Sequence, residues 1–276
     1  MKIKLVTDCS ANYSPNITQD ISYVPLKIVT DEAEYLDTPD LDIPKMLVEL
    51  QNYKGKSGTA CPGISDWIDA FGDADIVYGA SLTSALSGCY NAGVIAAKEY
   101  MDSHEGAQVF LLDSLSTGPE LQLIMEKYQE MIEAGMGFHE ICKAIVQYRK
   151  STKLMFSLES LDNLAKNGRV NPVVAKAIGL LGIRIVGQAS REGTLEPLHK
   201  CRGEKKALEQ LFSSMEESGF HGGKVRFSHS YNAKAVMVLE DMIIAKYPDC
   251  DISVSENRGL CCFYAESGSV LVGFET

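Results

Sequence analysis

Residues 75–88 contain the part of the sequence that decides the fold: Asp75-Ile76-Val77-Tyr78-Gly79-Ala80-Ser81 and, after Leu82, Thr83-Ser84-Ala85-Leu86-Ser87-Gly88. The first half is a short apolar run, which predicts a buried strand. The second half is a cluster of hydroxyl side chains closed by a glycine, and a helical pattern follows to about residue 101. A strand, a polar turn and a helix in this order are typical of a parallel α/β sheet.

The same unit recurs on both sides of this stretch. Residues 2–7 alternate and end at the polar turn Asp8-Cys9-Ser10, and residues 108–112 lead into Asp113-Ser114-Leu115-Ser116-Thr117-Gly118. Residues 24–29 predict another strand, and helices are expected at about 120–133 and 138–149. Because the carboxyl ends of parallel strands share one edge of a sheet, the three polar clusters should converge there.

The second half of the chain has a different pattern. It predicts helices at about 157–167, 172–181, 204–218 and 233–247, and strands at 183–188, 224–229, 251–256, 261–265 and 270–274. We therefore expect two α/β domains, residues 1–150 with a parallel sheet and residues 151–276 with a mixed sheet. A ligand cleft between them is the common arrangement.

The composition of the 276 residues limits the partners. A formal net charge of -11 disfavours nucleic acids and anionic lipid head groups, so any anion site must be local. The amino terminus is too charged for a signal peptide, and the apolar stretch 173–189 is broken by Lys176 and Arg184. No membrane span is expected, and these features favour a cytoplasmic location.

Motifs for common cofactors are missing. The eight cysteines form no C-x-x-C pair, and the chain has no Walker loop, no G-x-G-x-x-G and no G-x-S-x-G elbow. We therefore expect no bound metal, nucleotide or other cofactor.

The polar clusters allow several interpretations. Ser84 or Ser87 at a helix start could help to bind a carboxylate or phosphate, although spacing alone favours a simple cap. Asp8 and Asp113 could ligate a metal or act as bases, but an Asp after a strand more often caps a loop. Cys9 could be a nucleophile, although the sequence shows no obvious histidine partner.

Seven segments, in order, match motifs of one family: Val6-Thr7-Asp8-Cys9-Ser10, Thr59-Ala60-Cys61-Pro62, Ser84-Ala85-Leu86-Ser87-Gly88-Cys89-Tyr90, Leu112-Asp113-Ser114, residues 160–170, Leu181-Gly182-Ile183-Arg184 and Lys200-Cys201-Arg202-Gly203. On these segments the chain resembles the DegV family, bacterial fatty-acid-binding proteins that serve as the acyl-carrying subunit of fatty acid kinase.

The resemblance implies a binding protein rather than an enzyme. It would hold a long-chain fatty acid non-covalently and present the carboxylate to a separate fatty acid kinase. The carboxylate would be held by Thr59, Ser87 and the Gly88 backbone, and the acyl chain would enter a tunnel lined by residues such as 173–181. We include the hydroxyls of the converging clusters in the predicted site: Ser10, Ser84, Ser114 and Thr117. The resemblance places Arg169 and Arg202 near the head group, as docking residues for the kinase.

The carboxyl-terminal segment departs from the family pattern. The family often has a histidine near the head group, and the corresponding stretch here is Tyr264-Ala265-Glu266-Ser267-Gly268-Ser269. A carboxylate at Glu266 would repel the fatty acid head unless it were protonated or turned away. Two alternative functions remain open: an acyltransferase or esterase that uses Cys9, Cys61 or Ser87, and a binder of another carboxylate or phosphate metabolite.

Overall fold

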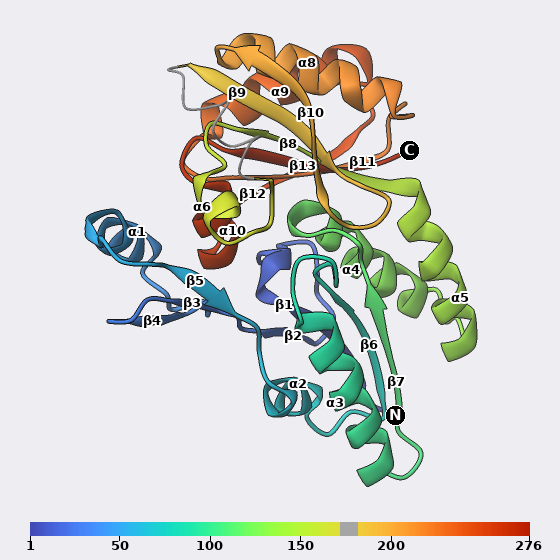
Figure 1. The fold of residues 1–276 in the computed structure, drawn as a ribbon. Coiled ribbons are helices and arrows are strands. Elements are labelled where there is room, and N and C mark those ends of the chain that lie inside the picture. Colours follow the sequence, from blue (N-terminus) through green and yellow to red (C-terminus); the bar gives the residue numbers. More distant parts are fainter. Residues whose placement is uncertain (172–181) are drawn as a thin grey trace.

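The computed structural model describes residues 1–171 and 182–276, which form two α/β parts (Figure 1). The first contains a four-stranded sheet in the order β2-β1-β6-β7. Its strands are Ile21–Val24, Ile3–Asp8, Ile76–Ser81 and Gln108–Asp113, and every neighbouring pair is parallel. The predicted parallel sheet is confirmed.

Helices cover both faces of this sheet. On one face α2 (Ile64–Phe71) and α3 (Cys89–Ser103) pack against the strands, and on the other lie α4 (Gly118–Glu133) and α5 (Phe138–Tyr148). Neighbouring strand residues such as Val77 and Tyr78 therefore enter different hydrophobic clusters. A strand that is buried on both faces has a continuous run of apolar residues, which is why the sequence of residues 76–81 predicted a buried strand correctly.

A small antiparallel sheet extends from this part in the order β4-β3-β5, with strands Glu34–Leu36, Lys27–Val29 and Gly58–Ala60. Helix α1 (Ile43–Asn52) packs beside it. The single strand expected at 24–29 is wrong: β2 ends at Val24 and β3 begins at Lys27. Pro25 lies between them, and it has no N–H to donate to a ladder. The break lets the chain leave one sheet and enter another.

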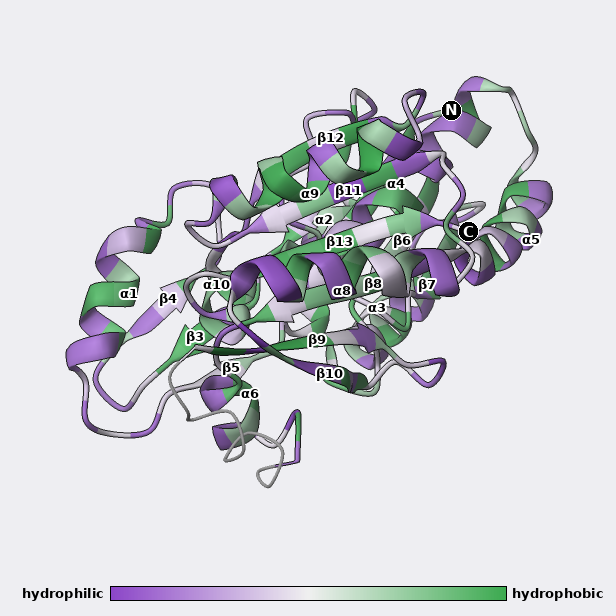
Figure 2. Ribbon diagram, turned by 90° about the horizontal axis from the view of Figure 1, so that it is seen from above, coloured by the Kyte–Doolittle hydropathy of each residue, from purple (hydrophilic) through white to green (hydrophobic). Residues whose placement is uncertain are grey.

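The second part contains a six-stranded mixed sheet in the order β10-β9-β8-β13-β11-β12. These strands are Leu195–Arg202, Ile183–Ala189, Thr152–Leu158, Val270–Glu275, Lys224–His229 and Asp251–Glu256; only β11 and β12 pair in parallel. Helices α8 (Glu204–Glu217) and α9 (Ala233–Lys246) cover one face. In Figure 2, β9 and β13 are largely hydrophobic, whereas α8 is largely hydrophilic. The predicted mixed sheet is confirmed.

Helix α4 joins the two parts. Its apolar residues Leu121, Ile124 and Tyr128 pack on the parallel sheet, while its start lies against β13, where a side chain at Gly273 would collide with Pro119 and Glu120. The strands of the parallel sheet end at Asp113, and those of the mixed sheet begin at Thr152, after α5 and the short helix η2 (Arg149–Ser151). We keep the boundary between residues 150 and 151 as a prediction.

Two expected elements of the second part are wrong. Residues 157–161 do not begin a helix, because Thr152–Leu158 form the interior strand β8 and the helix α6 spans only Asp162–Lys166. Residues 261–265 are not a strand but belong to the helix α10, Gly259–Ala265. A short apolar run buried on all sides carries no period that separates strand from helix. The helix expected at 172–181 lies outside the described residues.

Candidate functional site

An apolar cavity of about 80 Å³ lies where the two sheets meet. β8, α10 and the turn after β6 supply most of its lining residues, and leucine is the commonest residue type among them. The lining residues are Leu26, Thr59, Leu82, Leu86, Ser87, Thr117, Leu154, Phe156, Leu158, Leu164, Arg169, Leu195, Leu260, Cys261, Tyr264, Ala265 and Leu271. Four predicted residues are brought together there: Thr59, Ser87, Thr117 and Arg169.

A second apolar cavity adjoins the first. It has a volume of about 100 Å³ and shares Phe156, Leu164 and Leu195 with its neighbour. It continues to Val170 and Asn171, where the first described range of the chain ends. The predicted wall at residues 173–181 lies outside the described residues.

The polar groups of the first cavity come from separate elements. The Thr59 hydroxyl on β5 lies 2.8 Å from the Tyr264 hydroxyl on α10. The Ser87 hydroxyl accepts a hydrogen bond of 3.2 Å from the N–H of Cys89, next to Gly88, which is the N-cap of α3. Ser87 therefore helps to close its turn and also lines the cavity. The start of a helix favours a negative charge, because its N–H groups are free and its dipole is positive.

Arg169 lines the cavity without a carboxylate partner. Its Nε donates to the Leu86 carbonyl at 3.2 Å, and its Nη1 donates to the carbonyl of Asn167. No ion pair joins it to any other residue in ranges 1–171 and 182–276. The guanidinium group is therefore held in place by backbone carbonyls, and no carboxylate of the described residues neutralises its charge.

The remaining predicted site residues lie elsewhere. Ser10 is fully buried beneath the first turn, and Ser84 is exposed, with its N–H bonded to Asp113. Ser114 is buried and bonded to the Ser116 carbonyl; it lines a different cavity. Arg202 is exposed at the end of the edge strand β10. None of these four side chains lines the apolar cavity as described.

Asp8 and Asp113 fix the polar turns to one another. The buried Asp8 carboxylate accepts the N–H groups of Ser10 at 3.0 Å and Leu82 at 2.7 Å, and burial raises its pKa. Asp113 accepts the N–H groups of Ser84 and Leu115, both at 3.1 Å. Within the described residues, no three His, Cys, Asp or Glu side chains cluster as metal ligands. The two carboxylates act as loop caps.

Tyr264 is a site residue that the sequence analysis missed. It was assigned to a strand, but Asp37 starts a helix there by accepting the N–H groups of Gly259 at 2.9 Å and Leu260 at 2.8 Å. The lining residues 260, 261, 264 and 265 follow the period of a helix, and this spacing is the signal that could have found Tyr264.

Glu266 is turned away from the cavity. Its carboxylate accepts the Ser160 hydroxyl at 2.9 Å and the Asn163 N–H at 3.0 Å, at the start of α6. Its φ of 57° lies in the left-handed region and directs the chain out of α10. The carboxylate caps a neighbouring helix and does not line the cavity, which is the turned-away arrangement that we considered.

The proposed nucleophiles have no visible base beside them. Burial raises the pKa of the Cys9 thiol well above its usual value, and the side chain is only 1% exposed. No histidine is among the described residues that line the apolar cavity. His229 lies at the end of β11, where its Nδ1 accepts the N–H of Asn232. Among the described residues, neither the Ser87 nor the Cys61 side chain has a hydrogen bond to a histidine, the partner that commonly activates such nucleophiles.

No helix in the described part of the chain has the length and apolar character needed to cross a lipid bilayer.

Solved structures similar to this chain include two of closely matching shape. One is a DegV family protein of Eubacterium eligens loaded with heptadecanoic acid, with 43% identity, a TM-score of 0.97 and 99% of both chains covered. The other is the fatty acid kinase B3 protein of Streptococcus pneumoniae loaded with linoleic acid, with 35% identity, a TM-score of 0.96 and coverage of 100% of this chain and 99% of that one.

Sequence relatives agree with these structures. A DegV domain-containing protein of Streptococcus gordonii is 36% identical over 279 residues, which covers 100% of this chain and 99% of the relative. The family model described as "Uncharacterised protein, DegV family" matches residues 2–276. With both observations spanning almost the whole sequence, the chain belongs to the DegV family.

Proposed function

We propose that this protein binds one long-chain fatty acid non-covalently. The observation that carries the proposal is the composition of the apolar cavity: more than half of its lining residues are leucine or phenylalanine, yet the lining also includes the Thr59–Tyr264 hydroxyl pair and the Ser87 hydroxyl beside a helix start. Such a site suits a ligand with a long apolar body and one small anionic group.

The carboxylate would lie between Thr59, Ser87 and the Gly88 N–H. Hydroxyl and backbone N–H groups can donate to a carboxylate from several directions, and bonds to a charged acceptor are the stronger ones. Tyr264 adds a phenol hydroxyl to this set. The Arg169 guanidinium lines the same cavity and has no carboxylate partner among the described residues, and we assign it to docking and not to holding the fatty acid carboxylate.

The acyl chain would extend from the first cavity into the second. Leu195 and Phe156 line both, so the passage between them is apolar. Each buried methylene contributes about 0.8 kcal/mol, and a short acid would gain too little to offset the cost of immobilisation. The ligands of the two solved structures described above, heptadecanoic and linoleic acid, support a long chain.

We further propose that the protein presents the carboxylate to a separate kinase and does not itself catalyse a reaction. The absence of a histidine from the described cavity lining disfavours the acyltransferase and esterase alternatives. The similarity to the fatty acid kinase B3 protein supports a kinase partner. Arg169 is the better docking candidate, because it lines the cavity, whereas Arg202 lies on the sheet edge.

The experiment for the binding function is denaturing extraction of purified protein followed by mass spectrometry. We expect about one free long-chain fatty acid per chain on the area argument, and an unmodified protein mass. A covalent acyl adduct would support the transferase or esterase instead. The proposal would be contradicted if fatty acids of several lengths left the melting temperature of delipidated protein unchanged.

The docking role needs a coupled assay with a cognate kinase subunit. Arg169→Ala should lower acyl-phosphate formation while fatty acid affinity is retained, and Arg202→Ala is the comparison variant. If affinity and turnover fall together in Arg169→Ala, the residue holds the ligand and is not a docking residue.

A further inference from the structure

A third cavity, which is polar, lies on the other side of the turn that follows β7 from the first apolar cavity. It has a volume of about 440 Å³ and takes its walls from three separate segments of the chain. Its lining residues are Ser114, Leu115, Glu120, Arg149, Lys150, Thr152, Lys153, Ala189, Ser190 and Arg191. Thr117 of the same turn lines the apolar cavity, so residues 113–117 form the partition between the two.

Contacts between the two parts of the protein fix the shape of this polar cavity. The Arg149 guanidinium donates to the Asp113 carbonyl at 2.9 Å, which ties the connection after α5 to the turn after β7. On the opposite side, the turn between β9 and β10 reaches the first part (Figure 1). A side chain at Gly193 of that turn would collide with Thr83 and approach Leu115 to 3.1 Å.

The charge of the cavity is opposite to that of the protein. Four cationic side chains, Arg149, Lys150, Lys153 and Arg191, line it together with one carboxyl group, Glu120. The formal net charge of the whole chain is -11. Within the described ranges, neither the Lys153 nor the Arg191 side chain forms an ion pair or a side-chain hydrogen bond, although the Lys153 charge acts on the nearby Glu120 carboxyl group. Grouping unpaired cations costs free energy through their mutual repulsion, which a bound anion would relieve.

Glu120 does not neutralise this group effectively. Its carboxyl group is 5% exposed and accepts the Thr152 hydroxyl at 2.8 Å. Burial raises the pKa of Glu120 to about 7, so a substantial fraction is uncharged at neutral pH. The cavity therefore keeps an excess of positive charge.

We infer that this polar cavity binds a small molecule that carries a diphosphate group. Arginine and lysine side chains that converge from several directions match the oxygens of phosphate groups. A single phosphate would leave part of the charge and most of the volume unused. Leu115 and Ala189 are the only lining residues with apolar side chains among those described, and the charged and hydroxyl groups of the other walls would find no partner on an acyl chain. This site goes beyond the fatty acid function and is separated from it by the partition.

The test is titration of the full-length protein with pyrophosphate, orthophosphate, sulfate and ADP by calorimetry, with melting temperature as a second readout. We expect pyrophosphate to bind with a stoichiometry of one and more tightly than orthophosphate or sulfate. Binding of ADP as tightly as pyrophosphate would identify a nucleotide as the source of the diphosphate, and weaker binding of ADP a free diphosphate.

Variants locate the site. Lys153→Gln and Arg191→Gln should each weaken pyrophosphate binding about tenfold, since each removes a charged donor. Lys234→Gln on α9 makes the same charge change at an exposed position and should leave the affinity unchanged. Arg191 lies on an exposed turn, so its variant tests the site even if Lys153→Gln folds poorly.

Fatty acid affinity, measured on the same samples, should be unchanged in all three variants. Equal weakening by Lys234→Gln would indicate general charge attraction and overturn the inference. The inference is also overturned if millimolar pyrophosphate produces neither heat nor a change in melting temperature, or if sulfate binds as tightly as pyrophosphate. If the wild-type protein binds no fatty acid, that result contradicts the function proposed for the apolar cavity and leaves the diphosphate inference unaffected.

Discussion

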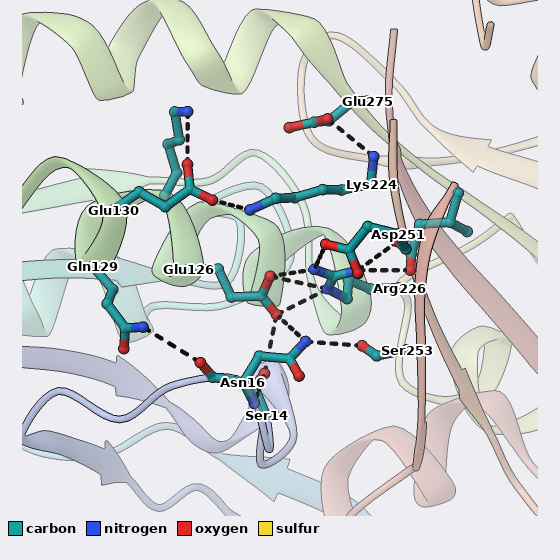
Figure 3. A network of polar contacts seen from close by, with 12 residues as sticks. Ser14, Asn16, Glu126, Gln129, Glu130, Lys224, Arg226, Asp251, Ser253 and Glu275 are labelled. Carbon is teal, nitrogen blue, oxygen red and sulfur yellow. Dashed lines mark hydrogen bonds and ion pairs between the residues drawn. The ribbon is translucent and has the colours of Figure 1, made fainter. Parts of the chain in front are cut away.

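The contact between the two parts of this protein has two regions of opposite character. In one, α4 meets β11 and β12 through buried charges (Figure 3). In the other, the turn after β6 and helix α10 meet β8 across an apolar cavity. The first region is filled with side-chain hydrogen bonds, and the second is walled by leucines. Both join the same two sheets, so the difference between them shows how one interface can be rigid and still leave space for a ligand.

Arg226 is the centre of the charged region. Its guanidinium, 2% exposed, donates to both carboxylate oxygens of Glu126 at 2.7–2.9 Å and to the Asp251 carboxylate at 2.8 Å. Lys224 of β11 forms a further ion pair with Glu130, one helical turn beyond Glu126. Asn16 extends the network by donating to Glu126 and Ser253, both at 3.1 Å.

The two regions have different physical consequences. A bidentate ion pair is directional, so the charged region fixes the orientation of α4 against the mixed sheet. Contacts between aliphatic side chains are not directional, and the apolar region can accept methylene groups in place of empty space. We infer that the charged region holds the sheets in position so that the apolar cavity persists without its ligand.

The largest expected effect is the loss of Arg226. Arg226→Ala leaves Glu126 as a buried charge without its partner, which should cost about 3–5 kcal/mol of unfolding free energy. Chemical denaturation measures this value. Lys234→Ala, at an exposed position, should stay within about 0.5 kcal/mol of wild type.

A second variant separates charge from packing in this region. Adding Glu126→Gln to Arg226→Ala removes the unpaired charge and should recover part of the loss. If the double variant is as unstable as the single one, packing of the arginine and not its charge stabilises the interface.

The next effect concerns Glu120, a carboxyl group on α4 that, in contrast to Glu126, has no ion-pair partner in the described part of the chain. Burial raises its pKa to about 7 from an ordinary value of 4.5. The folded state therefore binds this proton more tightly than the unfolded chain does. Its contribution to stability declines as the pH rises from about 4.5 to above 7, and the total loss is about 3 kcal/mol.

Denaturation of wild type and Glu120→Gln at about pH 5 and about pH 8 tests whether the stability contribution of Glu120 declines as the pH rises. The glutamine variant should gain stability relative to wild type at the higher pH. An equal difference at both values would show that Glu120 keeps its ordinary pKa.

A smaller effect is expected from Ser87→Ala in the apolar region. The hydroxyl is proposed to donate to the carboxylate, a bond worth about 1.5–3 kcal/mol, so fatty acid affinity should fall about ten- to hundredfold. Ser84→Ala is the matched control, because Ser84 belongs to the same turn but is exposed and does not line the cavity. Fluorescent fatty acid displacement and melting curves on the same samples measure both quantities. If Ser87→Ala lowered stability but left fatty acid affinity unchanged, Ser87 would serve only to cap the start of α3.

The smallest effect is expected from Tyr264→Phe. The variant keeps the ring and removes the hydroxyl that lies 2.8 Å from Thr59. A neutral hydrogen bond contributes about 1 kcal/mol, so affinity should fall about fivefold. Tyr35→Phe removes a hydroxyl that bonds Glu49 outside the cavity and should not change affinity. Tighter binding by Tyr264→Phe would mean that the phenol competes with the ligand for Thr59.

The parallel sheet was predictable because its signal is local. Residues 76–81 form an apolar run ended by hydroxyls, and burial on both faces by helices gives a strand this character. The expectation that the polar turns after β1, β6 and β7 lie at one edge of the sheet followed from the parallel direction of the strands alone. Ser87 and Thr117, from two of these turns, line one cavity, while Ser10 and Ser114 turn inward, a choice that depends on neighbouring packing.

The amino-acid sequence by itself determined the alternation of strands and helices, the family and the hydroxyls from which the site is built. Only the tertiary structure decided that residues 259–265 form a helix, because the carboxylate that accepts its first N–H groups is Asp37, more than 200 positions away. The same holds for the partner of Arg226, whose guanidinium meets Glu126 at a separation of 100 residues. Local secondary-structure propensity depends on residues that are close in the sequence, whereas these capping bonds and buried ion pairs join residues that become neighbours only on folding.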